Sequence, residues 1–186
     1  RAGEGMVTNL LLVTTGLGLG GAEVVVRDLA VGIDRGRFNV TVCCMRALGL
    51  IGEELARDGV DIFVLDPGEL QQTNRQDGSR NRLTAGDYLT FLKLRRVSRE
   101  KRIEVLHSHT TYALTDGCLA KLTTAGLRLV HTFHFGNYPH KDRRALLIEG
   151  LATRVTYRLN VGDNVQREQI RSVYRNQDGR IRTVRN

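Results

Sequence analysis

The segment 9–27, NLLLVTTGLGLGGAEVVVR, decides the fold of this chain. Leu10 to Val13 are all apolar, which is typical of a strand buried between two layers of helices. The run gives way to four glycines, and from Ala22 onward the apolar residues recur with the spacing of a helix, at Val25, Leu29 and Ile33. The segment therefore predicts a strand, a glycine turn and a helix in direct succession.

The glycine turn predicts an anion site. Bare backbone N–H groups and the positive end of a helix dipole meet where a strand passes through glycines into a helix, and a phosphate is the natural ligand there. We expect a side chain at these positions to obstruct a turn with positive φ or the approach of a ligand to the main chain. The candidate binding glycines are Gly18, Gly20 and Gly21, which follow Gly16. The alternative, that any tight strand-to-helix turn favours glycine, stays open.

The rest of the chain alternates strands with helices, without a hairpin signal or an internal linker. The expected strands are 38–45, 60–65, 103–106, 127–133, 155–161 and 180–184, and the expected helices are 50–58, 84–102, 112–125, 141–153 and 163–174. Polar residues 67–82 predict a loop. The pattern predicts a single α/β domain over 1–186: a Rossmann-like, doubly wound, mostly parallel sheet of about seven strands, with ligands at the carboxyl ends of the strands.

Composition fits one globular domain. Of the 186 residues, 41% are hydrophobic and 26% charged, and no apolar run approaches the roughly 18 residues needed to cross a bilayer. The first residues, RAGEGMVTNLLLV, do not resemble an export signal. Cys43, Cys44 and Cys118 are odd in number, and two are adjacent, so we expect packed thiols rather than disulfides. These features predict a cytoplasmic protein.

The net charge of +8 predicts attraction to phosphates or anionic lipids. Basic residues concentrate on the outer face of the helix expected up to Arg102, between Lys93 and Arg102. This helix face is either simply solvated or a contact with an anionic membrane surface, which would place the protein at the inner face of the cytoplasmic membrane. Nucleic acid is not an expected partner, because aromatic residues are only 5% of the chain and do not alternate with the basic ones.

Four of the five histidines lie at the expected carboxyl ends of two strands. His107 and His109 end one strand and share a face of it, whereas His131 and His134, three apart at the end of the next, cannot both do so. Three interpretations compete: a zinc site, which lacks a clear third ligand; core histidines bonded to the backbone; and a polar wall for a hydroxyl-rich or phosphorylated ligand. We favour the polar wall, which would share its edge of the sheet with Gly136.

The glycines also match the dinucleotide pattern G-x-G-x-x-G, through Gly16, Gly18 and Gly21. A NAD protein would carry an acidic residue at the end of its second strand, where this chain has Cys43-Cys44-Met45-Arg46. Arg46 would suit the 2′-phosphate of NADP. An NADP-dependent oxidoreductase is therefore an alternative, although no Tyr-x-x-x-Lys pair accompanies the glycines.

Taken together, four motifs resemble the N-terminal half of group 1, or family 4, glycosyltransferases of the GT-B fold. They are G-G-A-E at 20–23, H-S-H at 107–109, H-T-F-H-F-G at 131–136 and the closing strand that runs into Val184-Arg185-Asn186. Their order and spacing cover nearly the whole chain.

The resemblance implies half of an enzyme with two Rossmann-like domains that face each other across a cleft. In that family the N-terminal domain mainly holds the acceptor, and the C-terminal domain binds the sugar nucleotide. Sugar is transferred with retention and without an obligatory metal or other cofactor. By resemblance, Gly20 and Gly21 would lie near the donor diphosphate and the acceptor, His134 would approach the transferred sugar, and His109 would lie beside the acceptor.

One departure from the family is informative. No two glutamates here have the Glu-x7-Glu spacing that resemblance leads one to expect in the donor domain. We therefore expect this chain to be the acceptor half of a larger enzyme, to pair with its own C-terminal domain, and to be inactive alone. The expected partners are a nucleotide sugar and a glycan or lipid-linked acceptor. A third alternative is a non-catalytic α/β module that binds a phosphorylated ligand.

Overall fold

The computed structural model describes residues 7–65, 89–134, 142–174 and 179–184. It contains a single seven-stranded sheet in the order β3-β2-β1-β4-β5-β6-β7, and every neighbouring pair is parallel. The strands are β1 (Thr8–Gly16), β2 (Phe38–Ala47), β3 (Asp61–Val64), β4 (Val105–Ser108), β5 (Arg128–Phe133), β6 (Arg158–Val161) and β7 (Ile181–Thr183). The predicted Rossmann-like α/β fold is confirmed.

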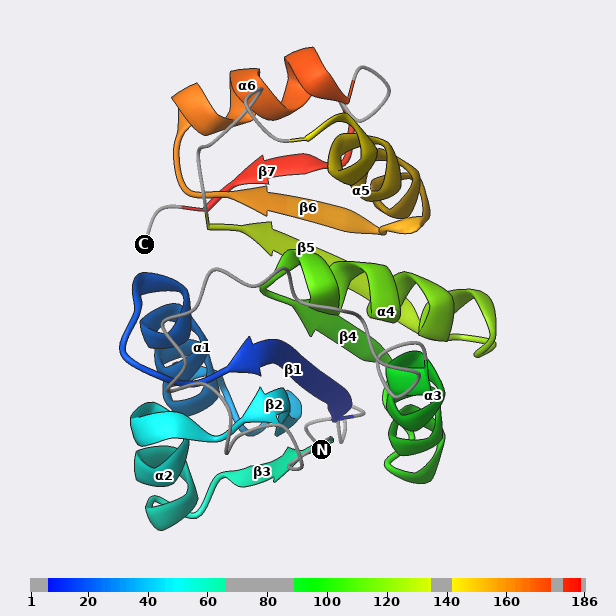
Figure 1. Cartoon of the computed structure of the whole chain (residues 1–186). Coiled ribbons are helices and arrows are strands. Elements are labelled where there is room, and N and C mark those ends of the chain that lie inside the picture. The colour runs from blue at the N-terminus through cyan, green and yellow to red at the C-terminus, as the bar shows by residue number, and fades with distance from the viewer. Residues whose placement is uncertain (1–6, 66–88, 135–141, 175–178, 185–186) are drawn as a thin grey trace, which may run out of the picture.

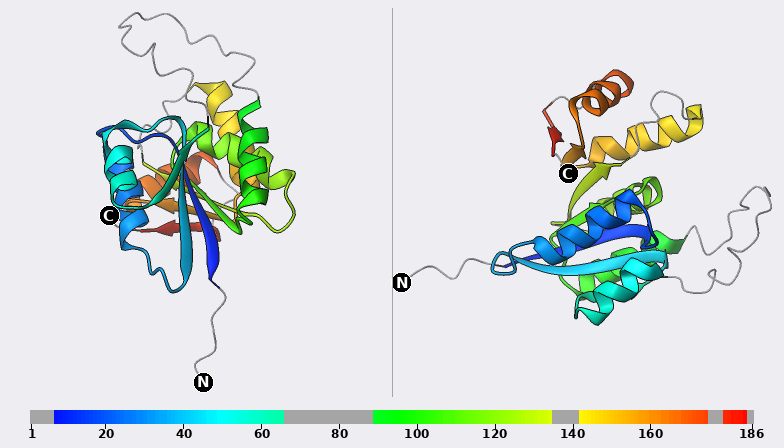
Figure 2. Two further views of the ribbon diagram at one scale, coloured as in Figure 1. Left: turned by 90° about the horizontal axis from the view of Figure 1, so that it is seen from below. Right: turned by 90° about the vertical axis from the view of Figure 1, so that its left-hand side faces the viewer.

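Helices cover both faces of the sheet, as Figure 1 shows. They are α1 (Gly21–Gly32), α2 (Gly49–Arg57), α3 (Thr90–Glu100), α4 (Thr111–Leu122), α5 (Arg143–Val155) and α6 (Asn164–Val173). Helices α1 and α2 lie on one side of β1–β3, whereas α3, α4 and α5 lie on the opposite side of the sheet (Figures 1 and 2). Right-handed crossovers explain this separation, because the chain first adds β2 and β3 on one side of β1 and then adds β4 to β7 on its other side.

β1 is buried on both faces, as its unbroken apolar run predicts. Leu10 and Leu12 belong to the core under α1 and α2, and Leu11 and Val13 belong to the core under α3 and α4. Burying a leucine fully contributes roughly 1.5–3 kcal/mol, so this one strand anchors both layers of the domain.

The structure corrects the predicted buried side of α3. Helical spacing predicts Leu89, Leu92 and Val97 on or near that side, together with Tyr88, which lies outside the described residues. Leu89 and Leu92 are instead 51% and 42% exposed, and the buried residues are Thr90, Leu94 and Ser98. Ser98 can be buried because its hydroxyl donates to the Leu94 carbonyl at 2.8 Å, and the pattern of apolar residues did not show this.

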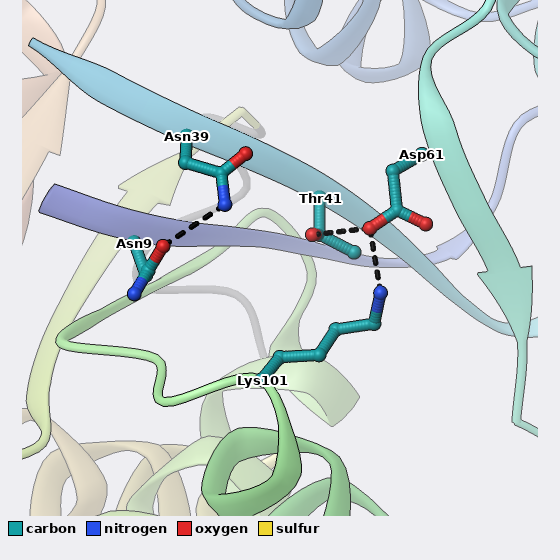
Figure 3. Close-up of polar contacts among 5 residues, drawn as sticks. All are labelled: Asn9, Asn39, Thr41, Asp61 and Lys101. Atoms are coloured by element: carbon teal, nitrogen blue, oxygen red, sulfur yellow. Dashed lines mark hydrogen bonds and ion pairs between the residues drawn. The ribbon is translucent and has the colours of Figure 1, made fainter. Parts of the chain in front are cut away.

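Polar contacts at the amino ends of the strands tie α3 to the sheet (Figure 3). Lys101 Nζ lies 2.6 Å from Asp61 Oδ2, which also accepts a 2.7 Å hydrogen bond from Thr41 Oγ1. Burial opposes ionisation of Asp61, but the bonds from Lys101 and Thr41 outweigh it, so the pKa of this carboxyl lies below its ordinary value. One of the basic residues expected to face outward is therefore held by β3.

Several predicted features lie outside the described residues. These are the 67–82 loop, the Thr84–Asp87 capping box, Gly136 with most of the 134–140 loop, and the final Arg185-Asn186. Asp163 was predicted to cap the last helix, and it does so by accepting a 2.7 Å bond from the Gln166 amide.

Candidate functional site

The glycine turn joins the carboxyl end of β1 to the first turn of α1. Gly20 is the residue before α1, it has extended backbone, and no side chain caps the helix there. A Cβ on Gly18 or Gly21 would meet nothing within 4 Å. The amides at this end of α1 therefore retain the open approach that an anion requires.

The predicted positive-φ turn at these glycines is wrong. Among the described residues, the glycines with positive φ are Gly49, Gly59 and Gly126, which adjoin other helices. The sharp change of direction after β1 is achieved differently, because the buried Leu17 carbonyl accepts bonds from the Ile51 and Gly52 amides at the start of α2. Gly49 allows this close approach, since any Cβ on it would collide with the Leu17 carbonyl.

Three of the histidines meet at the carboxyl edge of the sheet beside this turn. The rings of His107 and His109 lie 4.2 Å apart, and those of His109 and His134 lie 5.2 Å apart and nearly parallel. His109 Nδ1 lies 3.0 Å from His134 Nε2. The predicted cluster of His107, His109 and His134 is therefore present as a continuous stack that joins the end of β4 to the end of β5.

His131 lies on the other face, as the strand spacing predicted. It is buried, its Nδ1 lies 2.9 Å from Ser108 Oγ, and its ring meets the edge of Phe133. Of the alternatives considered for the histidines, a core histidine is the nearest description of this residue, although its bond goes to a serine hydroxyl and not to the backbone.

His109 is almost fully buried in this chain, and the acceptor contact expected for it by resemblance stays a prediction. It is 1% exposed, whereas His134 is half-buried, and the backbone amide of His109 is bonded to the Val13 carbonyl. Its ring nitrogen Nδ1 hydrogen-bonds to His134. His109 therefore contacts His134 directly at the end of β4.

The proton positions in this pair follow from hydrogen-bond accounting. His109 Nε2 is buried without a partner among the described residues. A buried donor without a partner is rarer than a buried acceptor without one, so this nitrogen is best left unprotonated. His109 then carries its proton on Nδ1 and donates it to His134 Nε2, which leaves His134 an N–H on Nδ1. His134 can thus present a hydrogen-bond donor at the carboxyl edge.

Electrostatics keep this stack neutral. Burial is the main cause that lowers the pKa values of all three rings, to about 4 for His107 and well below the ordinary value for His109. Charge repulsion between the rings adds to the effect for His107 and His109. The negative charge of Glu23 acts in the opposite direction on His134 without overcoming burial. At neutral pH the stack can donate and accept hydrogen bonds without carrying positive charge.

Several polar neighbours were missed by sequence reasoning. Thr132 Oγ1 lies 2.7 Å from His107 Nε2 and accepts a 3.3 Å bond from Asn160 Nδ2, which extends the polar row across β5 and β6. Thr15 Oγ1 lies 2.8 Å from Thr110 Oγ1, and so joins β1 to the start of α4. The signal was available, because each of these residues lies at or near the carboxyl end of a predicted strand.

Glu23 was predicted to point away from the buried face of its helix. It nevertheless lies at the glycine turn, where a Cβ on Gly20 would collide with its carboxylate. A residue other than glycine at position 20 would displace the flexible end of the Glu23 side chain.

The model of Glycosyltransferase Family 4 matches residues 19–186. The chain belongs to glycosyltransferase family 4. No curated protein sequence matches it significantly. The family assignment favours glycosyl transfer over the NADP-dependent oxidoreductase that Arg46 left open. The guanidinium of Arg46 instead lies over the Tyr112 ring, 5.6 Å from its centroid.

Solved glycosyltransferases share the fold. Anabaena HepE in complex with UDP and glucose superposes with a TM-score of 0.73 at 16% identity, over 95% of this chain and 44% of HepE. The lipopolysaccharide outer core galactosyltransferase WaaB gives a TM-score of 0.62 at 10% identity, over 96% of this chain and 46% of its own. Sucrose-phosphate synthase from Thermosynechococcus elongatus gives 0.61 at 13% identity, over 96% and 48%. This family 4 chain thus spans less than half of these proteins.

Neither a membrane-spanning helix nor a metal-binding cluster occurs among the described residues. No helix among them is long and apolar enough to cross a membrane. No cluster of three or more His, Cys, Asp or Glu side chains that could hold a metal ion occurs within the described ranges.

Proposed function

We propose that this chain is the acceptor-binding side of a retaining glycosyltransferase, which transfers sugar from a nucleotide-sugar donor to a glycan or lipid-linked acceptor. The observation that carries the proposal is the stack of His107, His109 and His134 beside an uncapped helix N-terminus at the carboxyl edge. Such an edge offers neutral hydrogen-bonding rings for sugar hydroxyls and free amides for phosphate oxygens.

His134 is the residue that we expect to contact the transferred sugar. Its proposed Nδ1–H would donate to a sugar hydroxyl or to an oxygen on which charge develops during transfer. Gly18, Gly20 and Gly21 would line the approach of the donor diphosphate and the acceptor. The reaction needs no resident cofactor in this proposal, because the nucleotide sugar is a substrate.

The donor is expected to bind mainly to a C-terminal domain of the same protein, as in the family resemblance. HepE, which this chain covers to less than half its length, has been crystallised with UDP, with UDP-glucose, and with UDP and glucose. We therefore propose that the 186 residues alone do not turn over, because most contacts to the leaving nucleotide lie in the other half.

The test compares the 186-residue chain with the longer protein that contains it. Both are incubated with UDP-, GDP- and ADP-sugars and candidate acceptors, and the anomeric configuration of the product is read by NMR. Transfer by the longer protein with retained configuration supports the proposal. Inverted configuration refutes the mechanism, and equal turnover by the short chain refutes the division of labour.

We also propose that the enzyme works at the cytoplasmic face of an anionic membrane, where lipid-linked acceptors are found. The net charge of +8 supports this location, since each basic residue near an anionic surface contributes about 1 kcal/mol. Salt-sensitive sedimentation with anionic vesicles tests the location, and its absence would remove it.

A further inference from the structure

Helix α5 turns an apolar stripe away from the domain. Its buried residues, Glu149, Ala152 and Thr153, face the sheet. Because successive helical residues are about 100° apart, Leu147 and Leu151 lie nearly opposite these buried positions. Leu147, Ile148 and Leu151 are between 51% and 65% exposed. Helix α5 thus carries apolar residues on both sides, because Leu146, Ala152 and Val155 pack against the core as those of an ordinary surface helix do.

The neighbouring helix α4 also exposes apolar side chains. Its exposed residues Tyr112, Leu119 and Leu122 recur at helical spacing on the side opposite buried Ala113, Leu114 and Gly117. Helices α4 and α5 pack side by side on one face of the sheet (Figure 1). We call the six residues the α4–α5 apolar face: Tyr112, Leu119, Leu122, Leu147, Ile148 and Leu151.

This concentration is unusual for a surface that meets only water. The α4–α5 apolar face holds six of the fifteen large hydrophobic side chains that are exposed in the described parts of the chain. Single exposed leucines need no explanation, but a group on two adjacent helices marks an interaction surface.

The charges that α5 adds beside this face are mostly positive, whereas α4 places Asp116 between Tyr112 and Leu119. Exposed Arg143 and Arg144 precede the stripe of α5, and exposed Arg154 follows it. The acidic residues of this helix region are occupied elsewhere: Asp142 caps the helix by accepting from the Arg144 and Ala145 amides, and Glu149 is buried in hydrogen bonds to Thr111 and Tyr174. A partner of complementary character is therefore apolar with an anionic rim.

Helix α3, the basic helix predicted to meet a membrane, fits this role less well. Lys101 is bound to Asp61, Arg96 to Glu100, and Arg95 to the Thr123 carbonyl. At least half of the six basic side chains between Lys93 and Arg102 are thus engaged within the protein, which supports the simpler interpretation of a solvated face.

We propose that the α4–α5 apolar face docks on an anionic lipid surface, with its leucines in the boundary between headgroups and acyl chains and Arg143, Arg144 and Arg154 at the lipid phosphates. Arginine suits this position because its apolar stem can lie along lipid while its guanidinium reaches the headgroup layer. The inference rests on the proposed membrane location and is independent of the chemistry of transfer.

Vesicle binding tests the proposal without any assay of activity. The chain is sedimented with phosphatidylcholine vesicles that contain or lack phosphatidylglycerol. The double variant Leu147→Gln/Leu151→Gln is expected to lower the partition coefficient at least about tenfold, because each leucine loses apolar area to bury. The matched control is Leu50→Gln, at an equally exposed leucine of α2 on the opposite face of the sheet, and it should bind as the unchanged chain does.

A tryptophan reporter locates the contact directly, because the chain has no tryptophan of its own. In Leu147→Trp the emission should shift to the blue on anionic vesicles, and in Leu50→Trp it should not. Binding that the double variant leaves unchanged, with no shift at position 147, would overturn the assignment of this face while leaving membrane association intact.

The remaining outcomes are equally decisive. No vesicle binding by the unchanged chain would overturn both the face and the membrane location, but not the proposed transfer. Equal binding to neutral vesicles would overturn the role of the arginines. A dimer in solution that the double variant converts to a monomer would assign the face to a second copy instead.

Discussion

Acidification should unfold this protein through the histidine stack well before most of its carboxylates titrate. The ordinary histidine pKa is 6.5, and burial with repulsion from His134 lowers that of His107 to about 4. The unfolded chain therefore binds more protons than the folded protein between these two values. The stabilising contribution is fully present above pH 6.5 and is lost as the pH falls from 6.5 toward about 4.

The magnitude follows from the size of the shift. A difference of one pKa unit corresponds to about 1.4 kcal/mol, so the shift of His107 alone would contribute about 3 kcal/mol to the free energy of unfolding. Because the side chain is half-buried, solvent screening reduces this contribution to about 2 kcal/mol. His109 shifts in the same direction and adds to this loss. Domains of this kind are stable by about 5–15 kcal/mol, so the loss is a large fraction of the total.

Urea unfolding followed by circular dichroism at a series of pH values measures the effect. Near pH 5 we expect each neutral, buried histidine to add about 1.4 kcal/mol per pH unit to the slope of the unfolding free energy. The variant His107→Gln cannot titrate but can still bond to Thr132, so it should lose its share of the slope. A slope that is the same in this variant, or flat between pH 6.5 and 5, would refute the assignment.

Three further perturbations test the local structure. Gly49→Ala should lower the free energy of unfolding by at least about 2 kcal/mol, because it adds a clash with the Leu17 carbonyl to the penalty of positive φ. The control Gly59→Ala, at positive φ in open space, should lower it by only about 1 kcal/mol. Equal losses of stability in urea unfolding would disprove the anchoring of the turn by α2. Asp163→Ala removes the α6 cap and should cost about 1 kcal/mol, with no loss if the cap is dispensable. Burial raises the pKa of Cys44 to about 12 and also raises those of Cys43 and Cys118, so a thiol reagent such as Ellman's should label none of the three cysteines in the native protein and all of them in denaturant.

The fold could be predicted from the sequence because its strongest signals are local. The apolar run at Leu10–Val13 and the change to helical spacing at Ala22 specify a buried parallel strand and its following helix without reference to the rest of the chain. The positions of Gly59 and Gly126 after their helices were predicted for the same reason, and both have positive φ.

The failures depend on contacts between distant segments. Nothing near Leu17 in the sequence indicates that α2 binds its carbonyl, so the glycine turn was given the wrong backbone conformation. The burial of Thr90 and Ser98 in α3 depends on what packs against them, and a hydrophobicity pattern cannot show it. The strand spacing placed His107 and His109 on one face, but only the packed structure shows that His109 is covered and that His134 remains at the edge.

The most direct test of the account is the rate of sugar transfer by the proposed two-domain protein, with His134→Ala compared with the unchanged enzyme. Removing one donor aimed at developing charge typically costs about a hundredfold or more in kcat. We predict a loss of that order, with the urea midpoint little changed and the exposed α6 variant Glu168→Ala fully active. An undiminished rate in His134→Ala would contradict the assignment of the histidine stack as the working edge of this family 4 glycosyltransferase.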